Sequence, residues 1–199
     1  MEKKKTIVFG GAFNPPTLAH EAILKACVET SDKIDADIWV VPSGDRHDKQ
    51  ILAERECRIS YIKAMIADVA LDNVRINIIV DELDRAQVVE TIDTVNDFNN
   101  AYPDREFNWV FGADSISTMA DWRGGDWMLE NLDMFVVSRR GCKVNKLAKH
   151  AVNLEVSAHD VSSTDVRLRL ERGESVHGLV GPAVENLINK NTSPKRRGI

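Results

Sequence analysis

Short apolar runs alternate along this chain with longer stretches of helical spacing. Six runs predict β-strands, at residues 6–9, 37–41, 74–80, 107–111, 134–137 and 153–156. The first, second, fourth and fifth are apolar at nearly every position, which is typical of central parallel strands buried on both faces. The run that begins at Val74 alternates apolar and polar residues, which predicts a strand near an edge or with one wetter face.

Apolar residues spaced three and four apart predict helices between these strands. One stripe, from Ile59 to Val69, indicates a helix over about residues 52–70, and a second, from Val88, indicates one over about 86–101. Two short helices are expected near the C-terminus, one before Gly173 and one that starts at Pro182.

This alternation predicts an α/β fold, Rossmann-like and doubly wound, with a mainly parallel sheet and a short C-terminal helical segment. Its ligands are expected at the carboxyl ends of the strands. A chain of 199 residues suits a single domain over residues 1–190, with the helical segment at about 160–190 and a flexible tail at 191–199.

The charge balance narrows the possible partners. With 26 basic and 31 acidic residues, the net charge is −5, so we expect no broad basic surface for nucleic acid or membrane. A polyanionic ligand would be small and met by a few cations and backbone amides. Cys27, Cys57 and Cys142 are odd in number and form no CxxC pair, which favours the reducing cytosol over a disulfide framework or a zinc site.

The junction after the first strand carries the first candidate chemistry. Gly10 and Gly11 let a ligand approach the backbone closely, and a helix is expected from near Thr17. Thr17 and His20 are three residues apart, so they share one side of the first helical turn, where the helix dipole favours phosphate. The same residues also suit a tight turn with a capping threonine and a surface histidine.

Two motifs resemble those of one enzyme superfamily. The first resembles the signature of nucleotidyltransferases that join a nucleoside triphosphate to a phosphate-bearing acceptor, and it is matched at Gly10, Gly11, Phe13, Asn14, Pro15, Thr17 and His20. The second, at residues 161–167, resembles the family's Ile-Ser-Ser-Thr-x-Ile-Arg. Physically, Ser162 or Ser163 can cap a helix whose amides receive phosphate, and Arg167 adds a charge-assisted fork.

Residues between the motifs resemble those of bacterial nicotinate-nucleotide adenylyltransferases. Gly112 and Asp114 match a segment expected to meet a ribose, and Trp122 offers a flat face to a pyridine ring. Trp127 is expected only to pack. The segment at residues 43–49 resembles the family's loop after the second strand, in which Lys49 would reach a phosphate; His47 is a weaker match. We expect Arg58 to be structural.

Three residues depart from the family pattern. Thr17 stands where nicotinate enzymes usually carry His and phosphopantetheine adenylyltransferases carry Thr, and Ala19 replaces a Gly. Glu90, beside Thr91, would repel a nicotinate carboxylate but accept a hydrogen bond from a nicotinamide, unless it points to solvent. Both mononucleotides therefore remain open as acceptors, with nicotinate favoured by the overall pattern.

The resemblance implies transfer of the adenylyl group of ATP to a pyridine mononucleotide in NAD biosynthesis, in the cytoplasm. It implies catalytic roles for His20, Thr17 and Arg167, with Mg²⁺ carried by ATP, no protein metal site and a homo-oligomer as one possible assembly. The residues expected to bind ATP are Gly10, Gly11, Phe13, His20, Lys49, Gly112, Asp114, Ser162, Ser163, Thr164 and Arg167. Those expected to bind the acceptor are Ala12, Thr91, Trp122 and Glu90.

Two other functions remain open from the sequence. Thr17 favours an enzyme of the same superfamily with phosphopantetheine as acceptor. Thr17, Ala19 and Glu90 together also allow a nucleotide-binding regulatory module that has lost turnover.

Overall fold

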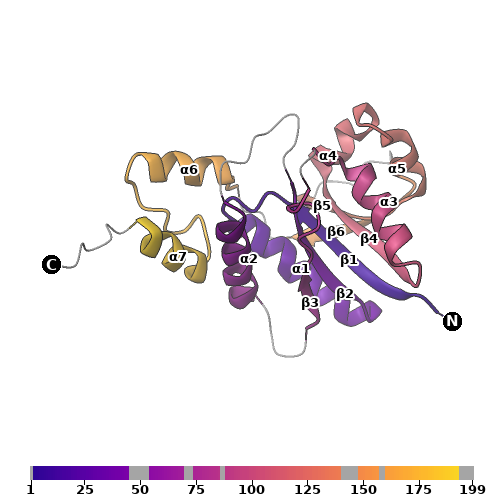
Figure 1. The fold of residues 1–199 in the computed structure, drawn as a ribbon, viewed down its shortest axis with the longest axis horizontal. Helices are drawn as coiled ribbons and strands as arrows, with labels where there is room; N and C mark the ends of the chain where they lie inside the picture. The colour runs from indigo at the N-terminus through magenta and orange to yellow at the C-terminus, as the bar shows by residue number, and fades with distance from the viewer. Residues whose placement is uncertain are drawn as a thin grey trace.

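The computed structural model describes residues 2–44, 54–69, 74–85, 88–139, 148–156 and 160–192. Within them lies a six-stranded sheet in the order β3-β2-β1-β4-β5-β6, with every neighbouring pair parallel (Figure 1). The strands are β1 (Lys4–Gly11), β2 (Asp37–Pro42), β3 (Ile76–Ile78), β4 (Arg105–Gly112), β5 (Asp133–Arg139) and β6 (His150–Val156). This arrangement confirms the predicted Rossmann-like α/β fold.

Strand burial follows the apolar pattern of the sequence. Every residue of β2 is buried, as expected for a strand covered on both faces. The alternating run near Val74 forms β3 at one edge of the sheet, and the weakest run forms β6 at the other edge. The expectation of an edge position for the alternating strand is therefore confirmed.

Seven α-helices and one 3₁₀ helix lie in the described residues. They are α1 (Leu18–Ile34), α2 (Arg55–Val69), α3 (Thr91–Ala101), α4 (Ala113–Thr118), η1 (Met119–Asp121), α5 (Gly125–Asn131), α6 (Ser163–Glu171) and α7 (Pro182–Thr192). The prediction that Val88 belongs to α3 was wrong, because Glu90 caps the helix and Val88 and Val89 precede it. The short helices α4 and α5 were not predicted.

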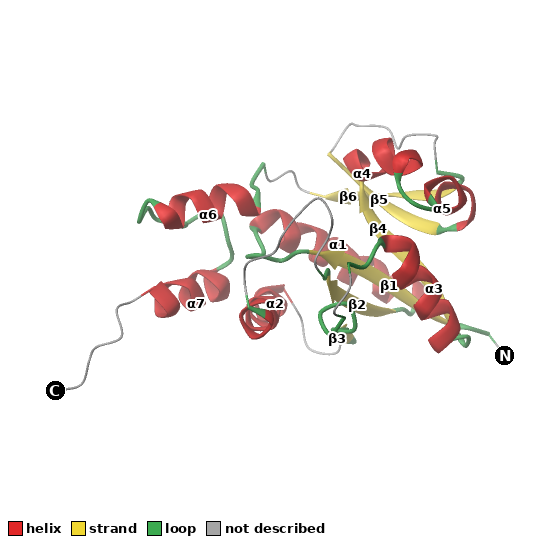
Figure 2. Ribbon diagram, turned by 45° about the horizontal axis from the view of Figure 1, so that its top comes forward, coloured by secondary structure: helices red, strands yellow, loops and turns green. Residues whose placement is uncertain are grey.

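The helices cover both faces of the sheet (Figure 2). Ile7 packs in a cluster with residues of α1, α2, α6 and α7, whereas its neighbour Val8 packs with residues of α3, α4 and α5. Successive side chains of β1 thus enter opposite cores, as strand geometry requires. This is the doubly wound arrangement that places a crevice where the connections from β1 and β4 diverge.

The C-terminal helices pack on the same side of the sheet as α1 and α2. The Leu18 amide donates to the Leu179 carbonyl at 3.0 Å, and the Asp68 carboxylate of α2 accepts from the Ala183 amide at the start of α7. Helix α7 continues to Thr192, two residues past the expected end of the domain at residue 190. Residues 193–199 lie outside the described residues.

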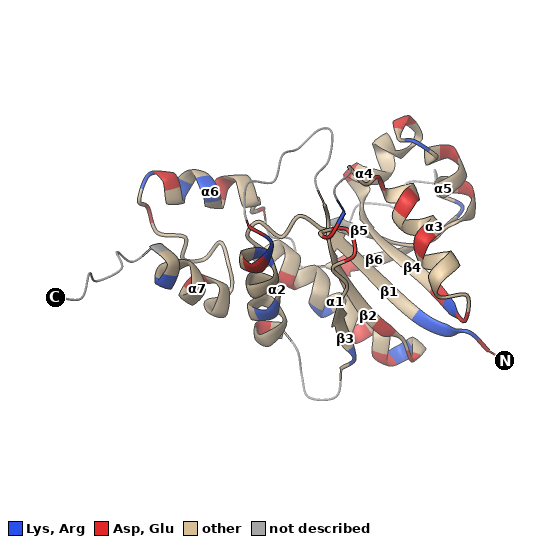
Figure 3. Ribbon diagram, in the orientation of Figure 1, with Lys and Arg blue, Asp and Glu red and all other residues tan. Residues whose placement is uncertain are grey.

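Charged residues of both signs are distributed over the helices (Figure 3). Helix α6 carries both signs, whereas α3 and α5 carry acidic residues and no basic ones. No helix in the described parts of the chain combines the length and the apolar character that a membrane span requires.

Candidate active site

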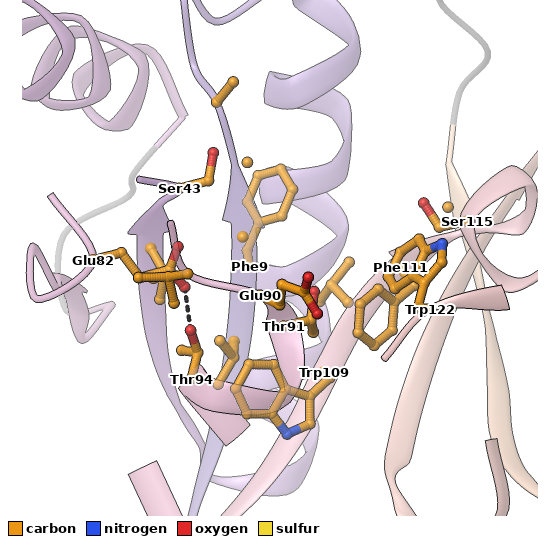
Figure 4. Close-up of a pocket in the computed structure, with 18 of the residues that line it drawn as sticks. Phe9, Ser43, Glu82, Glu90, Thr91, Thr94, Trp109, Phe111, Ser115 and Trp122 are labelled. Carbon is orange, nitrogen blue, oxygen red and sulfur yellow. Dashed lines mark hydrogen bonds between the residues drawn. The ribbon is translucent and has the colours of Figure 1, made fainter. Parts of the chain in front are cut away.

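A pocket of about 650 Å³ opens at the carboxyl ends of β1, β2 and β4. Its wall also includes residues from the start of α3 and from the segment between α4 and α5 (Figure 4). In the figure, Ser43 and Glu82 lie toward one side, Phe111 and Trp122 toward the other, and Glu90 and Thr91 between them. The pocket therefore occupies the crevice that the strand order predicts.

His20 faces this pocket from the first turn of α1. Its Nδ1 accepts a hydrogen bond from the Thr17 backbone amide at 3.1 Å and lies 2.9 Å from the Thr17 hydroxyl oxygen. An amide N–H can only donate, so Nδ1 carries a lone pair, and we assign the proton of the neutral ring to Nε2. The imidazole can thus act as a donor through Nε2, the nitrogen on the far side of the ring from Thr17.

Two aromatic rings hold the His20 side chain in place. The ring centroid of Phe13 lies 5.3 Å from that of His20, and that of Phe9 lies 6.4 Å away. Phe13 is fully buried, and its backbone has φ 45°, in the left-handed region that residues other than glycine rarely adopt. The orientation of the imidazole is consequently fixed by packing as well as by hydrogen bonds.

Thr17 and Phe13 lie behind the histidine rather than on the wall of the pocket. Both are fully buried, and neither is among the described residues that line the cavity. Gly10, Gly11 and Ala12, by contrast, all line it. The pocket wall at this point is therefore formed by the backbone after β1 and by the His20 imidazole from α1.

Arg58 ties together the loops that follow β1 and β2. It is 3% exposed, and its guanidinium donates to the Ala12 carbonyl at 2.9 Å and to the Ser43 carbonyl at 2.6 Å. These bonds agree with the structural role expected for Arg58. His47 and Lys49 lie outside the described residues.

Glu82 connects the second loop to α3 and was not identified from the sequence. Its carboxylate accepts from the Gly44 amide at 3.2 Å and from the Thr94 hydroxyl at 2.5 Å. The second bond is drawn in Figure 4. Glu82 follows β3 without a motif around it, so the sequence offered no signal for it.

The second sequence motif forms the start of α6 and contacts the first. Ser163 donates to the Pro15 carbonyl at 2.8 Å, and Arg167 donates to the Asn14 carbonyl at 2.7 Å and to the Thr164 hydroxyl at 3.1 Å. These residues are not among those that line the 650 Å³ pocket. The structure brings the two motifs together through side chain to backbone bonds.

Ser162 is the N-cap of α6, as its sequence position suggested. Its hydroxyl accepts from the Asp165 amide at 3.1 Å and donates to the Asp165 carboxylate at 2.6 Å. Hydrogen bonds from Ser162 also lower the pKa of Asp165 below its usual value. Ser162 therefore stabilises the helix start through a reciprocal capping pair.

Gly112 and Trp122 lie on the pocket wall near the end of β4. Gly112 is the N-cap of α4, where a methyl group would collide with the carboxylate of Asp114. Asp114 itself is exposed and is not among the lining residues. Trp122 is partly buried, and its ring meets that of Phe111 at 71° with centroids 6.4 Å apart. The expected packing role of Trp127 was wrong, because that side chain is 47% exposed.

Arg123, which follows Trp122, was missed by the sequence analysis. Its Nε donates to Glu90 at 2.8 Å, and its Nη2 contacts the Asp93 carboxylate. The bond from Arg123 is the main reason that the pKa of Asp93 lies below its usual value. Glu90, Thr91 and Arg123 all line the pocket. The residues predicted to bind the acceptor therefore share the pocket wall with Arg123, a cation that no sequence motif indicated.

Within the described residues, no group of three His, Cys, Asp or Glu side chains has an arrangement suited to a metal ion. Three acidic residues line the pocket, Glu82, Glu90 and Asp121, and of these Glu82 and Glu90 are engaged by Gly44, Thr94 and Arg123.

Comparisons with known proteins identify the family of this chain. The cytidylyltransferase-like family model matches residues 8–169. The "Probable nicotinate-nucleotide adenylyltransferase" of Shouchella clausii is 32% identical over 189 residues, which cover 94% of this chain and 95% of that protein. The protein of the same name from Clavibacter michiganensis is 32% identical over 188 residues, covering 92% and 90%.

Solved structures show the same fold. The Plasmodium falciparum nicotinic acid mononucleotide adenylyltransferase complexed with NaAD aligns with a TM-score of 0.76 at 21% identity, covering 94% of this chain and 96% of that one. The same enzyme complexed with APC aligns with a TM-score of 0.74. From the family model and the sequence relatives together, the chain belongs to the cytidylyltransferase-like family and, within it, to the nicotinate-nucleotide adenylyltransferases.

Proposed function

We propose that this chain transfers the adenylyl group of ATP to nicotinate mononucleotide, with nicotinamide mononucleotide as the alternative acceptor. The observation that carries the proposal is the His20 imidazole, fixed with Nε2 as its donor on the wall of a pocket whose other end holds Trp122 and Thr91. The enzymes with 32% identity bear the name of this reaction.

The reaction requires positioning more than a base. A phosphate oxygen of the mononucleotide attacks the α-phosphorus of ATP, the bond from that phosphorus to the bridging oxygen breaks, and pyrophosphate leaves with the electron pair. Because the attacking oxygen is already anionic, no residue needs to remove a proton. The protein's contribution is alignment and stabilisation of the negative charge that builds on the transferred phosphate.

In this scheme, His20 donates from Nε2 to an oxygen of the α-phosphate, and the backbone at Gly10, Gly11 and Ala12 lets the phosphates approach. Thr17 acts through His20, because its hydroxyl and amide both meet Nδ1. It is therefore a positioning residue.

The start of α6 holds the departing pyrophosphate in our proposal. The assignment to Ser163, Thr164 and Arg167 is supported by the bonds that join Ser163 to Pro15 and Arg167 to Asn14 and to Thr164, because these bonds hold the start of α6 against the first motif. A charge-assisted guanidinium contact suits a phosphate better than a neutral donor does. Lys49 would add a further cation.

We assign the remaining contacts to the two nucleosides. Gly112 and Asp114 are proposed for the adenosine ribose, and the face of Trp122 for the pyridine ring of the acceptor. Mg²⁺ enters as part of the MgATP substrate, since it binds phosphate oxygens and water in preference to a protein cage.

The test is pyrophosphate release from the full chain with ATP and Mg²⁺ plus nicotinate mononucleotide, nicotinamide mononucleotide or phosphopantetheine. We expect release with a pyridine mononucleotide and none with phosphopantetheine. Release with phosphopantetheine alone would contradict the acceptor assignment. ATP binding without release in any mixture would show a nucleotide-binding module instead.

A further inference from the structure

We propose that Arg123 is the specificity-determining residue that lets this pocket accept a pyridine ring bearing a carboxylate. The inference deepens the proposed function and rests on it. It concerns the ring end of the pocket, where Glu90 would otherwise oppose an anionic ring.

The ring end is built from acidic residues. Glu90 and Asp93 belong to the capping box of α3, and Glu82 reaches the same helix through Thr94. Figure 4 shows Glu90 and Thr91 between Glu82 and the Phe111–Trp122 pair. Without a cation, this surface would favour a neutral ring substituent that donates hydrogen bonds, such as a carboxamide, and would repel a carboxylate.

Arg123 changes the charge at this position. One guanidinium contacts both Glu90 and Asp93, with its Nε donating to Glu90 at 2.8 Å. Nη1 has no hydrogen-bond partner among the residues that the structure describes, so its two N–H groups can donate to a ligand. A carboxylate on the ring therefore meets a compensated Glu90 and a guanidinium donor.

Because Arg123 is next to Trp122 in the chain, its charge should affect binding of the acceptor and not binding of ATP. The two residues are adjacent in the chain and both line the pocket, and the Trp122 ring is the surface proposed for the pyridine. The bonds from Arg123 to Glu90 and Asp93 fix the guanidinium relative to the start of α3. The same segment therefore positions both Trp122, proposed to stack on the ring, and Arg123, proposed to contact the ring substituent.

The inference makes opposite predictions for two substitutions. Arg123→Ala should lower the ratio of kcat/KM for nicotinate mononucleotide over nicotinamide mononucleotide by roughly tenfold, as expected for loss of one charge interaction near a protein surface. Glu90→Gln should raise the same ratio, because it removes the repelling carboxylate. Both effects should appear mainly in the KM of the acceptor, with the KM of ATP unchanged.

Arg85→Ala is the matched control. Arg85 also pairs with an aspartate of α3, Asp97, and it lines a smaller pocket that adjoins the main one at Val88, Val89 and Arg123, but it does not line the main pocket itself. This variant should keep the parental ratio. Arg123→Lys should restore part of the ratio, since a lysine keeps the charge but not the fork.

The measurement is initial-rate pyrophosphate release with each mononucleotide, for the parent and the four variants. Opposite shifts in Arg123→Ala and Glu90→Gln, with Arg85→Ala unchanged, would support the inference. If the parent is active and the ratio for Arg123→Ala stays within a factor of two of that for Arg85→Ala, the inference is overturned and the proposed function stands. If the parent releases pyrophosphate with neither mononucleotide, both are overturned. Should Arg123→Ala fail to fold, Glu90→Gln decides, and an unshifted ratio there overturns the inference.

Discussion

The two ends of the pocket are built in different ways. At the end proposed for the phosphates, here called the phosphate end, His20 on the pocket wall and the first turn of α6, which is outside the lining, are held by bonds to the backbone at Asn14, Pro15 and Thr17. At the ring end, Glu90 and Arg123 are held by bonds between side chains that are one-third or more exposed. Backbone partners do not change with substitution, whereas side-chain partners do. The phosphate end is therefore the part that a sequence motif can specify, whereas the ring end depends on side-chain pairs that no motif specifies.

The largest expected effect comes from removing the imidazole at the phosphate end. His20→Ala should lower kcat by at least ~10²-fold with either mononucleotide, comparable to losing an oxyanion donor. Pyrophosphate release under saturating substrates measures it. The exposed His177 offers a matched control, and His177→Ala should keep parental turnover. Turnover of His20→Ala within a few-fold of the parent would remove His20 from the mechanism.

A second, smaller effect is expected at the start of α6. Arg167→Ala should weaken the handling of ATP and of pyrophosphate by roughly tenfold, because a guanidinium contact to phosphate is lost. Both mononucleotides should be affected equally. Kinetics in the forward and reverse directions check this, and unchanged values in both would contradict the role given to α6.

A third substitution tests whether Thr17 acts through His20. Thr17→Val removes the hydroxyl that lies 2.9 Å from Nδ1 while keeping the shape of the side chain. We expect kcat to fall by about fivefold with KM unchanged, as for loss of one neutral hydrogen bond. Thr17→Ser keeps the hydroxyl and should remain near the parent. A rise in KM for ATP with kcat unchanged would instead mean that Thr17 binds substrate directly.

The smallest effect on activity is expected at Glu21, which follows His20 but points into the contact between α1, α2 and α7. Its side chain is 4% exposed, and burial, followed by the charge of Asp68, raises its pKa above the usual 4.5. The folded state therefore binds this proton more tightly than the unfolded state does. The stability that it contributes is present below about pH 4.5 and is lost as the pH rises through the raised pKa.

Glu21→Gln removes this titration without changing either end of the pocket. The variant should unfold at a higher temperature than the parent near neutral pH and show a smaller advantage at acidic pH. Thermal unfolding across this range checks it. A variant that is less stable than the parent at every pH would contradict the account of Glu21. A changed ratio of kcat/KM for nicotinate over nicotinamide mononucleotide would contradict the statement that Glu21 affects stability and not the pocket.

The sequence predicted the sheet, and the structure brings its two motifs into contact, for physical reasons. The central strands are buried on both faces, so their apolar runs are continuous. Ser163 and Arg167 belong to one short motif, and their partners Pro15 and Asn14 belong to the other. The start of α3 at Glu90 was not predicted, because the apolar stripe includes Val88 and so indicates an earlier helix start. Nor were the short helices α4 and α5, which lack a full amphipathic period.

The position of Thr17 and the role of Arg123 could not be read from the pattern. A threonine at a helix start looks the same whether its hydroxyl faces a ligand or a neighbouring imidazole, and only the buried geometry decides. Arg123 pairs with Glu90 and Asp93 across about 30 residues of chain, and no spacing rule links them.

The central claim is that the phosphate end performs the transfer and the ring end chooses the acceptor. The most direct measurement is pyrophosphate release with nicotinate and nicotinamide mononucleotides, side by side, for the parent, His20→Ala and Arg123→Ala. We predict that His20→Ala lowers both rates by the same factor and leaves their ratio unchanged, while Arg123→Ala changes the ratio. A shifted ratio in His20→Ala, or an equal loss with both acceptors in Arg123→Ala, would contradict the account.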